Sequence, residues 1–234
     1  MARAVGGENT VAVAFSGGVD SSVLAACARR HGRVVACSCS SEGSGDAAKS
    51  AAAAAEIGVE LVRTKLTMEV VARELSRLDL PFEPSLMDRS LWCLYSLAAQ
   101  SAAAAGARVM LLGQLADELF GGYAKYAQAL DAGGEGAAQS MMDEDLGGYG
   151  GRGRIRDVGA CSAWVEPKFP YEDRAVTEFA ASIPLSYKIT SSARKAVLRR
   201  AALILGVPEG IAGAAKKAAQ YSSGVQKLVV GSRF

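Results

Sequence analysis

The sequence predicts an α/β fold in which a mainly parallel sheet carries helices on both faces. Short apolar segments rich in β-branched residues alternate with segments of helical length and spacing. Turn residues bound each apolar segment, as expected for buried strands of a parallel sheet. This alternation indicates consecutive β–α–β units, whose crossovers are right-handed.

The first unit occupies residues 11–39. Residues 11–15 and 33–39 are the two apolar segments, and both have the length of buried strands. Residues 19–30 have the spacing of a helix that packs on a sheet. We expect Gly32 to cap this helix just after His31, where cationic residues favour a helix C-terminus.

The second unit begins at Asp46, a candidate N-cap for an alanine-rich helix that Gly58 ends. Residues 59–62 then form the third expected strand. Thr67 begins a further helix, which ends before the prolines at positions 81 and 84.

The last predicted strand covers residues 108–113, after a long helix that Asp88 caps and that runs to Gly106. Residues 131–159 contain eight glycines between Gly133 and Gly153 and few apolar anchors. We therefore expect a mobile loop there, of the kind that covers a site.

The C-terminal part of the chain is predicted to be mainly helical. Two helices are expected around residues 174–182 and 193–205, the first ending before Pro184 and the second at Gly206. No internal repeat is visible in the sequence.

Composition limits the classes of function. The chain has 234 residues, half of them apolar, which fits one domain spanning residues 1–234. With 26 basic and 24 acidic residues, no overall field attracts nucleic acid or a membrane surface. No apolar run reaches the roughly 20 residues of a membrane-spanning helix and no secretory leader is recognisable, so a cytoplasmic protein is expected. The five cysteines form no C-x-x-C pair, which argues for reduced buried thiols rather than a zinc site.

The strongest motif, S-G-G-V-D-S-S, lies at residues 16–22, between the first strand and the first helix. Paired glycines permit a sharp turn with exposed N–H groups, and serine hydroxyls with a helix N-terminus complete an anion cradle. An ordinary serine-capped helix would leave Asp20 unexplained, whereas Mg²⁺ between its carboxylate and a phosphate would explain it. The candidate binding residues are Ser16, Gly17, Gly18, Asp20, Ser21 and Ser22.

This motif resembles the S-G-G-x-D-S pyrophosphate loop of the PP-loop ATP pyrophosphatases, whose fold is a Rossmann-like sheet of the adenine nucleotide alpha hydrolase type. The resemblance implies that ATP, with Mg²⁺, is cleaved between its α and β phosphates while a substrate is adenylated. Members include asparagine, NAD and GMP synthetases and several tRNA-modifying enzymes.

A second motif, L-G-Q-L-A-D-E-L-F-G-G-Y at residues 112–123, resembles the S-G-x-G-A-D-E-L-F-G-G-Y segment of asparagine synthetase synthetase domains. It follows the fourth predicted strand, so Asp117 can face Asp20 across the carboxyl edge of the sheet. By resemblance, Asp20 and Asp117 hold the Mg²⁺ and Gly113 contributes to the nucleotide site. An acidic first turn of a helix is the alternative explanation for Asp117.

Three further segments resemble the same family. E-P-K-F-P-Y-E-D at residues 166–173 matches E-x-R-x-P-F-x-D, which implies that Glu166 lies near the attacking amine; Lys168 replaces the usual arginine. K-A-V-L-R at residues 195–199 matches K-x-x-L-R. K-K-A-A-Q-Y-S-S-G at residues 216–224 matches K-K-x-x-Q-x-x-S-G, which implies that Lys216, or its rival Lys217, contacts pyrophosphate. Ala214 stands where the family often has arginine.

The expected activity is an AMP-forming ligase that adenylates a small-molecule carboxylate, with aspartate as the best candidate, and joins it to ammonia or an amine. No glutaminase domain precedes the ATP-binding segment, so free ammonia, a separate glutaminase subunit and another amine all stay open as partners. A homo-oligomer is compatible with the sequence. The alternatives are adenylation of a nucleobase in RNA, which the absence of paired cysteines and of a basic surface disfavours, and a nucleotide-binding regulatory subunit without turnover.

Overall fold

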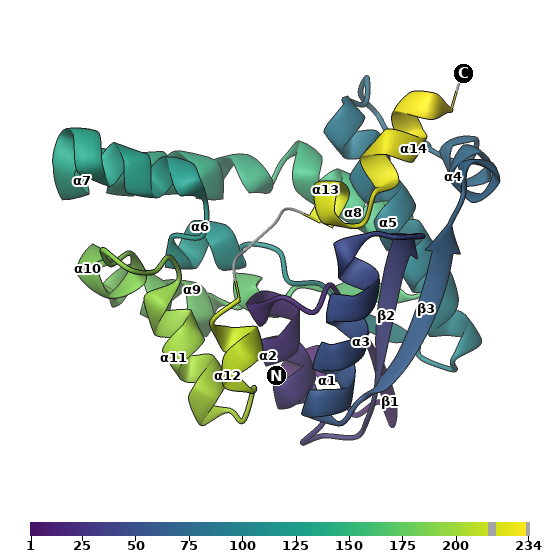
Figure 1. Ribbon diagram of the computed structural model, residues 1–234, viewed down its shortest axis with the longest axis horizontal. Helices are drawn as coiled ribbons and strands as arrows, with labels where there is room; N and C mark the ends of the chain where they lie inside the picture. Colours follow the sequence, from purple (N-terminus) through teal and green to yellow (C-terminus); the bar gives the residue numbers. More distant parts are fainter. Residues whose placement is uncertain (215–218, 233–234) are drawn as a thin grey trace.

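The computed structural model describes residues 1–214 and 219–232 and shows an α/β fold with a five-stranded sheet (Figure 1). All strand pairings are parallel, in the order β3-β2-β1-β4-β5. The strands are β1 (Thr10–Ala14), β2 (Arg33–Ser41), β3 (Glu60–Leu66), β4 (Val109–Leu111) and β5 (Glu166–Lys168). The predicted fold class is confirmed.

Helices connect and cover the strands. In the first half of the chain they are α1 (Ala2–Val5), α2 (Val19–Ala28), α3 (Gly45–Ile57), α4 (Met68–Leu75), α5 (Leu86–Ala104) and α6 (Ala116–Phe120). In the second half they are α7 (Ala124–Tyr149), α8 (Arg152–Ser162), α9 (Arg174–Ser182), α10 (Leu185–Lys188), α11 (Ala196–Ile204), α12 (Glu209–Ala212), α13 (Ala219–Ser222) and α14 (Val225–Gly231). None of the helices in the described residues is both long and apolar enough to cross a membrane.

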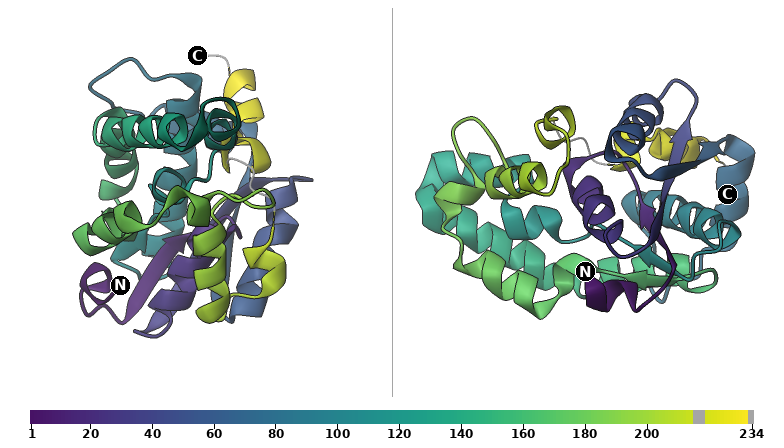
Figure 2. Two further views of the ribbon diagram at one scale, coloured as in Figure 1. Left: turned by 90° about the vertical axis from the view of Figure 1, so that its left-hand side faces the viewer. Right: turned by 90° about the horizontal axis from the view of Figure 1, so that it is seen from below.

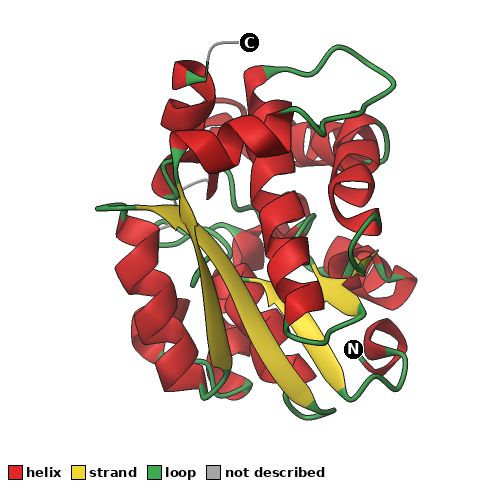
Figure 3. Ribbon diagram, turned by 90° about the vertical axis from the view of Figure 1, so that its right-hand side faces the viewer, coloured by secondary structure: helices red, strands yellow, loops and turns green. Residues whose placement is uncertain are grey.

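The sheet has an apolar core on each face, because successive side chains of a strand point to opposite faces. Val11 and Val13 of β1 join one core with residues of α2, α3 and α11, whereas Ala12 joins the other with residues of α4, α5 and α14. Figures 2 and 3 show helices on both sides of the strands. In Figure 1, α6, α7 and α10 lie to one side of the sheet, away from α4 and α14.

The strand order reverses at β1. The chain moves outward from β1 to β2 and β3, then returns through α5 to β4 on the opposite side of β1. Ligands of open α/β sheets bind where such a reversal occurs, at the carboxyl ends of the strands. We therefore expect a ligand-binding site at the loops that follow β1 and β4.

Several helix ends differ from prediction. Helix α2 ends at Ala28 with Arg29 as its C-cap, and Gly32 is not in the left-handed region. Helix α3 begins one residue before Asp46, with Ser44 as N-cap. Helix α5 is capped by Ser85, whose hydroxyl accepts from the backbone N–H of Asp88 in a reciprocal capping box. In the last two cases the acidic residue lies in the first turn, where the helix dipole also favours it. Thr67 and Gly58 cap their helices as predicted.

The expected mobile loop at residues 131–159 is wrong, because α7 and α8 cover most of it. The glycines lower helix propensity, but tertiary packing overrides it. Tyr126, Ala138 and Met142 of α7 form a third apolar cluster with Leu185 and Ile189. Within α7 the helix is kinked at Gly134, where φ is 75° and ψ is −173°, and α7 and α8 are separated at Gly150 and Gly151.

Candidate active site at the carboxyl edge of the sheet

The serine and glycine loop forms a tight turn between β1 and α2. The backbone N–H of Gly18 donates to Ser16 Oγ (3.3 Å), and Ser21 Oγ donates to the Gly18 carbonyl (3.2 Å). Gly17 has a φ of 69°, and a Cβ there would lie 2.9 Å from the carbonyl oxygen of Lys49. Only glycine fits this backbone without strain or collision.

The loop after β4 lies directly against this turn. A Cβ on Gly113 would be 3.5 Å from the Cβ of Asp20. Asp117 lies in the first turn of α6 and is 8% exposed. The reversal of strand order therefore brings Asp20 and Asp117 to one place, although they are 97 positions apart in the sequence.

One buried cation joins these two carboxylates. Lys195 Nζ lies 2.6 Å from Asp20 Oδ1 and 2.8 Å from Asp117 Oδ1, and the lysine side chain is 2% exposed. Burial lowers the pKa of Lys195, while the Asp20 carboxylate opposes that change. Lys195 itself has a φ of 57°, in the left-handed region, at the N-cap of α11.

The donor set fits a magnesium ion. Two carboxylates from the first turns of α2 and α6 already share the Lys195 ammonium, and Mg²⁺ in nucleotide sites is held by one or two carboxylates together with phosphates and water. Among the described residues, no group of three or more acidic, histidine or cysteine side chains could hold a metal without a substrate.

Basic side chains border the loop on its other side. Lys49, Arg194, Lys195 and Arg199 line a pocket of about 40 Å³ together with Ser16, Gly18 and Asp20. The Arg199 guanidinium donates to the carbonyls of Arg194 (2.7 Å) and Ala214 (3.0 Å), which fixes its position. Phosphate groups favour such an arrangement of cations and N–H donors.

A larger cavity of about 840 Å³ opens from the loop toward α5, α7 and α8. Its wall includes Ser16, Asp20, Ser21, Gly113 and Asp117 at one end. Cavities of this size lie within the range of small-molecule sites.

Glu118 also lines this cavity, next to Asp117. Burial raises the pKa of Glu118, and the hydrogen bond from Tyr123 Oη (2.9 Å) opposes that rise. A carboxylate with a raised pKa in a cleft is a candidate proton acceptor.

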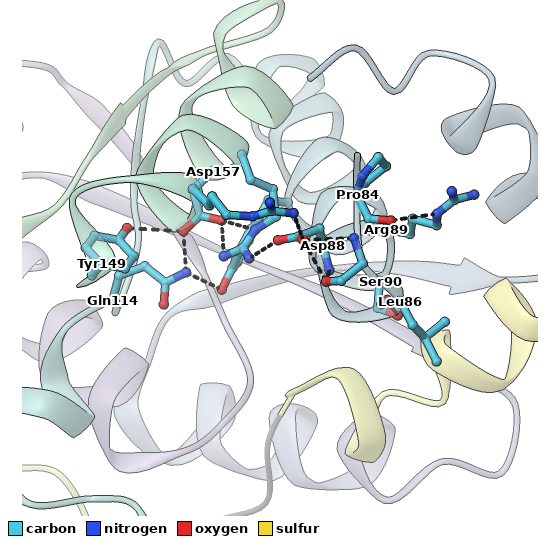
Figure 4. A network of polar contacts seen from close by, with 12 residues as sticks. Pro84, Leu86, Asp88, Arg89, Ser90, Gln114, Tyr149 and Asp157 are labelled. Carbon is cyan, nitrogen blue, oxygen red and sulfur yellow. Dashed lines mark hydrogen bonds and ion pairs between the residues drawn. The ribbon is translucent and has the colours of Figure 1, made fainter. Parts of the chain in front are cut away.

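The far wall contains a buried polar network (Figure 4). The Arg156 guanidinium donates to Asp88 Oδ1 (2.9 Å) and to Asp157 Oδ1 (2.8 Å). Asp157 Oδ2 accepts from Gln114 Nε2 (2.5 Å) and from Tyr149 Oη (3.1 Å). Burial raises the pKa of Asp157, whereas the Arg156 guanidinium lowers it. A network of this kind holds its members rigidly because each buried group is paired.

The structure brings together most, not all, of the residues predicted from sequence. Ser16, Gly18, Asp20, Ser21, Gly113 and Asp117 line the two cavities. Gly17 shapes the turn without lining either cavity, and Ser22 is fully buried behind it. Lys216 and Lys217 lie outside the described residues.

Glu166 is not brought together with the others. It is the first residue of β5 and pairs with Val109, the first residue of β4, so it lies toward the amino end of these parallel strands. Its carboxylate, 62% exposed, pairs with Lys168 Nζ at 2.5 Å. The motif match identified the segment that contains Glu166, but it could not predict where the Glu166 side chain lies.

Sequence reasoning also missed part of the site. Lys195 and Arg199 belong to the K-x-x-L-R motif, whose residues had been given no role. The place of that motif in the family pattern was the signal that could have identified them as site residues. Lys49 and Arg194 carry no pattern of their own, since only the fold brings them to the loop.

The glycine and serine loop lies where the strand order reverses, and beside it two aspartates share the Lys195 ammonium. These features define the class of protein: an α/β protein with the kind of site that binds phosphate groups. The chain belongs to the asparagine synthase family, whose sequence profile matches residues 1–147 and 156–231. This is a family of ATP-dependent amidation enzymes.

A curated relative supports the same family. The chain is 28% identical over 267 aligned positions to "Putative asparagine synthetase [glutamine-hydrolyzing] 1" of Methanocaldococcus jannaschii, with 97% of this chain covered. It spans about half of that relative, 48% of its length.

Among solved structures, the U34-tRNA thiolase NcsA of Methanococcus maripaludis with its [4Fe-4S] cluster is similar at 14% identity and a TM-score of 0.40. The match covers 94% of this chain and 72% of the thiolase. A likeness of that level carries no argument about activity.

Proposed function

We propose that this chain uses ATP and Mg²⁺ to adenylate a substrate carboxylate and then joins the acyl group to ammonia or an amine. The observation that carries the proposal is the meeting of Asp20 and Asp117 at one cation, beside the glycine and serine loop. Aspartate is the best candidate for the carboxylate, given the family.

The triphosphate would be held by the loop and its basic border. The serine hydroxyls of the loop and the N-terminus of α2 supply donors, and Lys49, Arg194 and Arg199 supply positive charge. These groups stabilise the charge that develops on pyrophosphate as the α–β bond breaks.

Asp20 and Asp117 would hold the Mg²⁺. When bound, this ion would neutralise phosphate charge and so favour the departure of pyrophosphate. Lys195 keeps the two carboxylates together at 2.6 and 2.8 Å and contributes a further positive charge beside them.

Amide formation requires a proton to leave the attacking nitrogen. Glu118 lines the cavity beside Asp117 and has a pKa raised by burial, so we propose its carboxylate as the acceptor. The relative's printed name describes glutamine hydrolysis, and this chain covers 48% of that relative. The nitrogen donor would be ammonia, free or supplied by a glutaminase, or another amine.

The test is exchange of labelled pyrophosphate into ATP with a panel of carboxylic acids. We expect aspartate-dependent exchange, followed by AMP release when ammonia is added. Asp117→Asn should lower exchange by about 100-fold or more, because metal-assisted charge stabilisation contributes several kcal/mol. Lys65→Met, which breaks the exposed Lys65–Glu42 pair and removes a residue that lines neither cavity, is the matched control and should keep full activity.

Other outcomes would contradict the proposal. Exchange that needs tRNA and no added acid would indicate nucleobase adenylation instead. Tight ATP binding without exchange for any acid would indicate a regulatory subunit without turnover.

A further inference from the structure

Tyr171 contacts both of the helices whose first turns carry the two aspartates. Its hydroxyl donates to the backbone carbonyl of Asp20 in α2 at 3.1 Å. Its ring packs edge-on against Phe120 of α6, with ring centroids 6.2 Å apart and ring planes at 74°. Phe120 ends the short helix in whose first turn Asp117 lies. Tyr171 therefore links the backbone of one aspartate to the helix that carries the other.

The segment around Tyr171 is itself held on several sides. The side chain is 5% exposed in the apolar core that includes α2, and it belongs to a 3₁₀ turn (Pro170–Glu172) that follows β5. Glu172 forms an ion pair with Arg154 of α8. Asp173 caps α9 with its side chain. Because the turn is fixed to the sheet and to two helices, Tyr171 can restrain the groups that it contacts.

Packing alone does not explain the Tyr171 hydroxyl. The family pattern E-x-R-x-P-F-x-D has phenylalanine at this position, and phenylalanine would fill nearly the same space against Phe120. A buried hydroxyl is costly unless it is hydrogen-bonded, and the Asp20 carbonyl supplies the acceptor here. Gly17 and Gly18 precede α2, and glycine permits many backbone conformations. A hydrogen bond from outside the loop therefore limits where Asp20 can lie.

The distance between the two aspartates affects which cation they bind best. Mg²⁺ requires near-ideal octahedral geometry with oxygens at about 2.0–2.1 Å, whereas Ca²⁺ accepts flexible arrangements of oxygens at about 2.3–2.6 Å. Asp20 and Asp117 both reach the Lys195 ammonium, at 2.6 and 2.8 Å. A displacement of Asp20 would therefore weaken binding of Mg²⁺ more than binding of Ca²⁺.

We propose that Tyr171 is a positioning residue, whose hydrogen bond to Asp20 and ring contact with Phe120 set the spacing of the two aspartates and so the preference of the nucleotide site for Mg²⁺ over larger cations. This inference rests on the proposed function, because it takes Asp20 and Asp117 as the metal ligands. Tyr171 lines neither cavity, so it acts through Asp20 and α6 and not by touching a ligand.

The preference can be measured by binding, without turnover. An ATP analogue that resists cleavage between its α and β phosphates is titrated by calorimetry into the protein, once with Mg²⁺ and once with Ca²⁺. We expect the wild-type protein to bind the analogue more tightly with Mg²⁺. In Tyr171→Phe, the ratio of the two affinities should fall about 2–10-fold, which corresponds to one neutral hydrogen bond, and affinity with Ca²⁺ should change little.

Tyr126→Phe is the matched control. Tyr126 is also fully buried, donates to Asp145 Oδ2 at 2.5 Å and lines neither cavity. Its hydrogen bond has a charged acceptor, so urea unfolding should show at least as large a loss of stability as in Tyr171→Phe. The ratio of affinities with Mg²⁺ and Ca²⁺ should nevertheless stay at the wild-type value. A purely structural role of Tyr171 would make the two variants alike.

The outcomes separate this inference from the proposed function. An unchanged ratio in Tyr171→Phe, or an equal loss of affinity with both ions, would overturn the role of Tyr171 while Mg²⁺-dependent binding by the wild type still supported the metal site. Wild-type binding that ignores both ions would remove the metal from the proposed function itself. A Mg²⁺ preference that depends on Tyr171, without pyrophosphate exchange for any acid, would overturn the ligase activity and support the positioning role.

Discussion

Lys195 is the residue on which the geometry of the site depends most directly. Its ammonium is almost completely buried and separates two carboxylates that would otherwise repel each other. It also carries a left-handed backbone, which places the side chain where a regular helix start would not. Because Lys195 lies between the two aspartates, its replacement should affect both the stability of the fold and the binding of a metal cation.

Replacing Lys195 by methionine should lower the free energy of unfolding by about 3 kcal/mol, because the buried Asp117 carboxylate and the partly buried Asp20 carboxylate lose their cation. Millimolar Mg²⁺ should restore part of the loss by binding between Asp20 and Asp117. Urea unfolding with and without Mg²⁺ measures both effects. Lys65→Met removes an exposed ion pair and should change stability by less than about 1 kcal/mol. An unfolding curve for Lys195→Met that ignores Mg²⁺ would contradict the shared cation site.

Gly17 is the second residue on which the geometry of the site depends, because its backbone conformation requires glycine. Gly17→Ala should cost about 1–2 kcal/mol for the left-handed backbone and more for the contact with the Lys49 carbonyl, and ATP affinity should fall with it. Gly43→Ala offers a matched control, since Gly43 has a φ of 72° and open space around it. Chemical denaturation and ATP titration of the two variants should separate backbone strain from displacement of the loop. Equal losses in both variants would show that the contact with Lys49 is unimportant.

At the scale of elements, helix α5 joins the fold to the far wall of the cavity. Its capping box ties Ser85 to Asp88, and Asp88 in turn accepts from Arg156 of α8. Burial alone would raise the pKa of Asp88, but the hydrogen bonds from Ser85 and the Arg156 guanidinium together lower it. The N-terminus of one helix and the middle of another are thus held by one carboxylate.

Because the folded-state pKa of Asp88 is lowered, its contribution to stability is present above the unfolded-state pKa of about 4 and is lost as pH falls through the folded value. Asp88→Asn should therefore cost about 3 kcal/mol at pH 7, where Arg156 loses a buried partner, and the difference from wild type should shrink below pH 4. Denaturant unfolding across pH 2–8 measures it. Ser85→Ala removes the cap alone and should cost about 1 kcal/mol. A difference that stays constant down to pH 2 would rule out this role of Asp88.

The elements that could be predicted from sequence are those with strong local signals. Residues 11–15 and 33–39 are apolar and β-branched, and the loop between them has the composition of an anion cradle, so both the parallel sheet and the loop were recognisable. Helix α7 was not, because its glycines oppose a helix locally and its stability depends on contacts with residues 185 and 189. Strand β5 has three residues, one of them proline, and is defined by its pairing with β4 rather than by its own pattern.

The same distinction holds for the site. Asp20 and Asp117 follow strands whose carboxyl ends share an edge, so their proximity could be deduced from the order of elements. Lys195 follows no strand, and its approach to the two aspartates depends on where α10 and α11 pack. The orientation of Gln114 depends on α5 and α8, which no local pattern records.

For the whole molecule, the site lies between two halves of the sheet, so a bound nucleotide should stabilise the fold as a unit. At a concentration 100 times its Kd, ATP with Mg²⁺ should add about 2.7 kcal/mol, which corresponds to a rise in Tm of about 5–10 °C for a chain of this size. Thermal unfolding with ATP, before and after removal of Mg²⁺ by a chelator, is the measurement.

Removing the metal should abolish most of that rise, and Asp20→Asn should show little rise in either condition. A full rise with the chelator present would mean that the nucleotide binds without a divalent ion, and the roles of Asp20 and Asp117 would need another explanation.

The hydrogen bond between Lys195 and Asp20 joins residues 175 positions apart. During translation, the segment carrying the aspartate leaves the ribosome long before the lysine has been made. A nascent chain therefore carries Asp20 and Asp117 without the Lys195 ammonium between them until residue 195 has been made. Products that stop before residue 195 would lack the closing charge, so the proposed activity would require synthesis to pass that point.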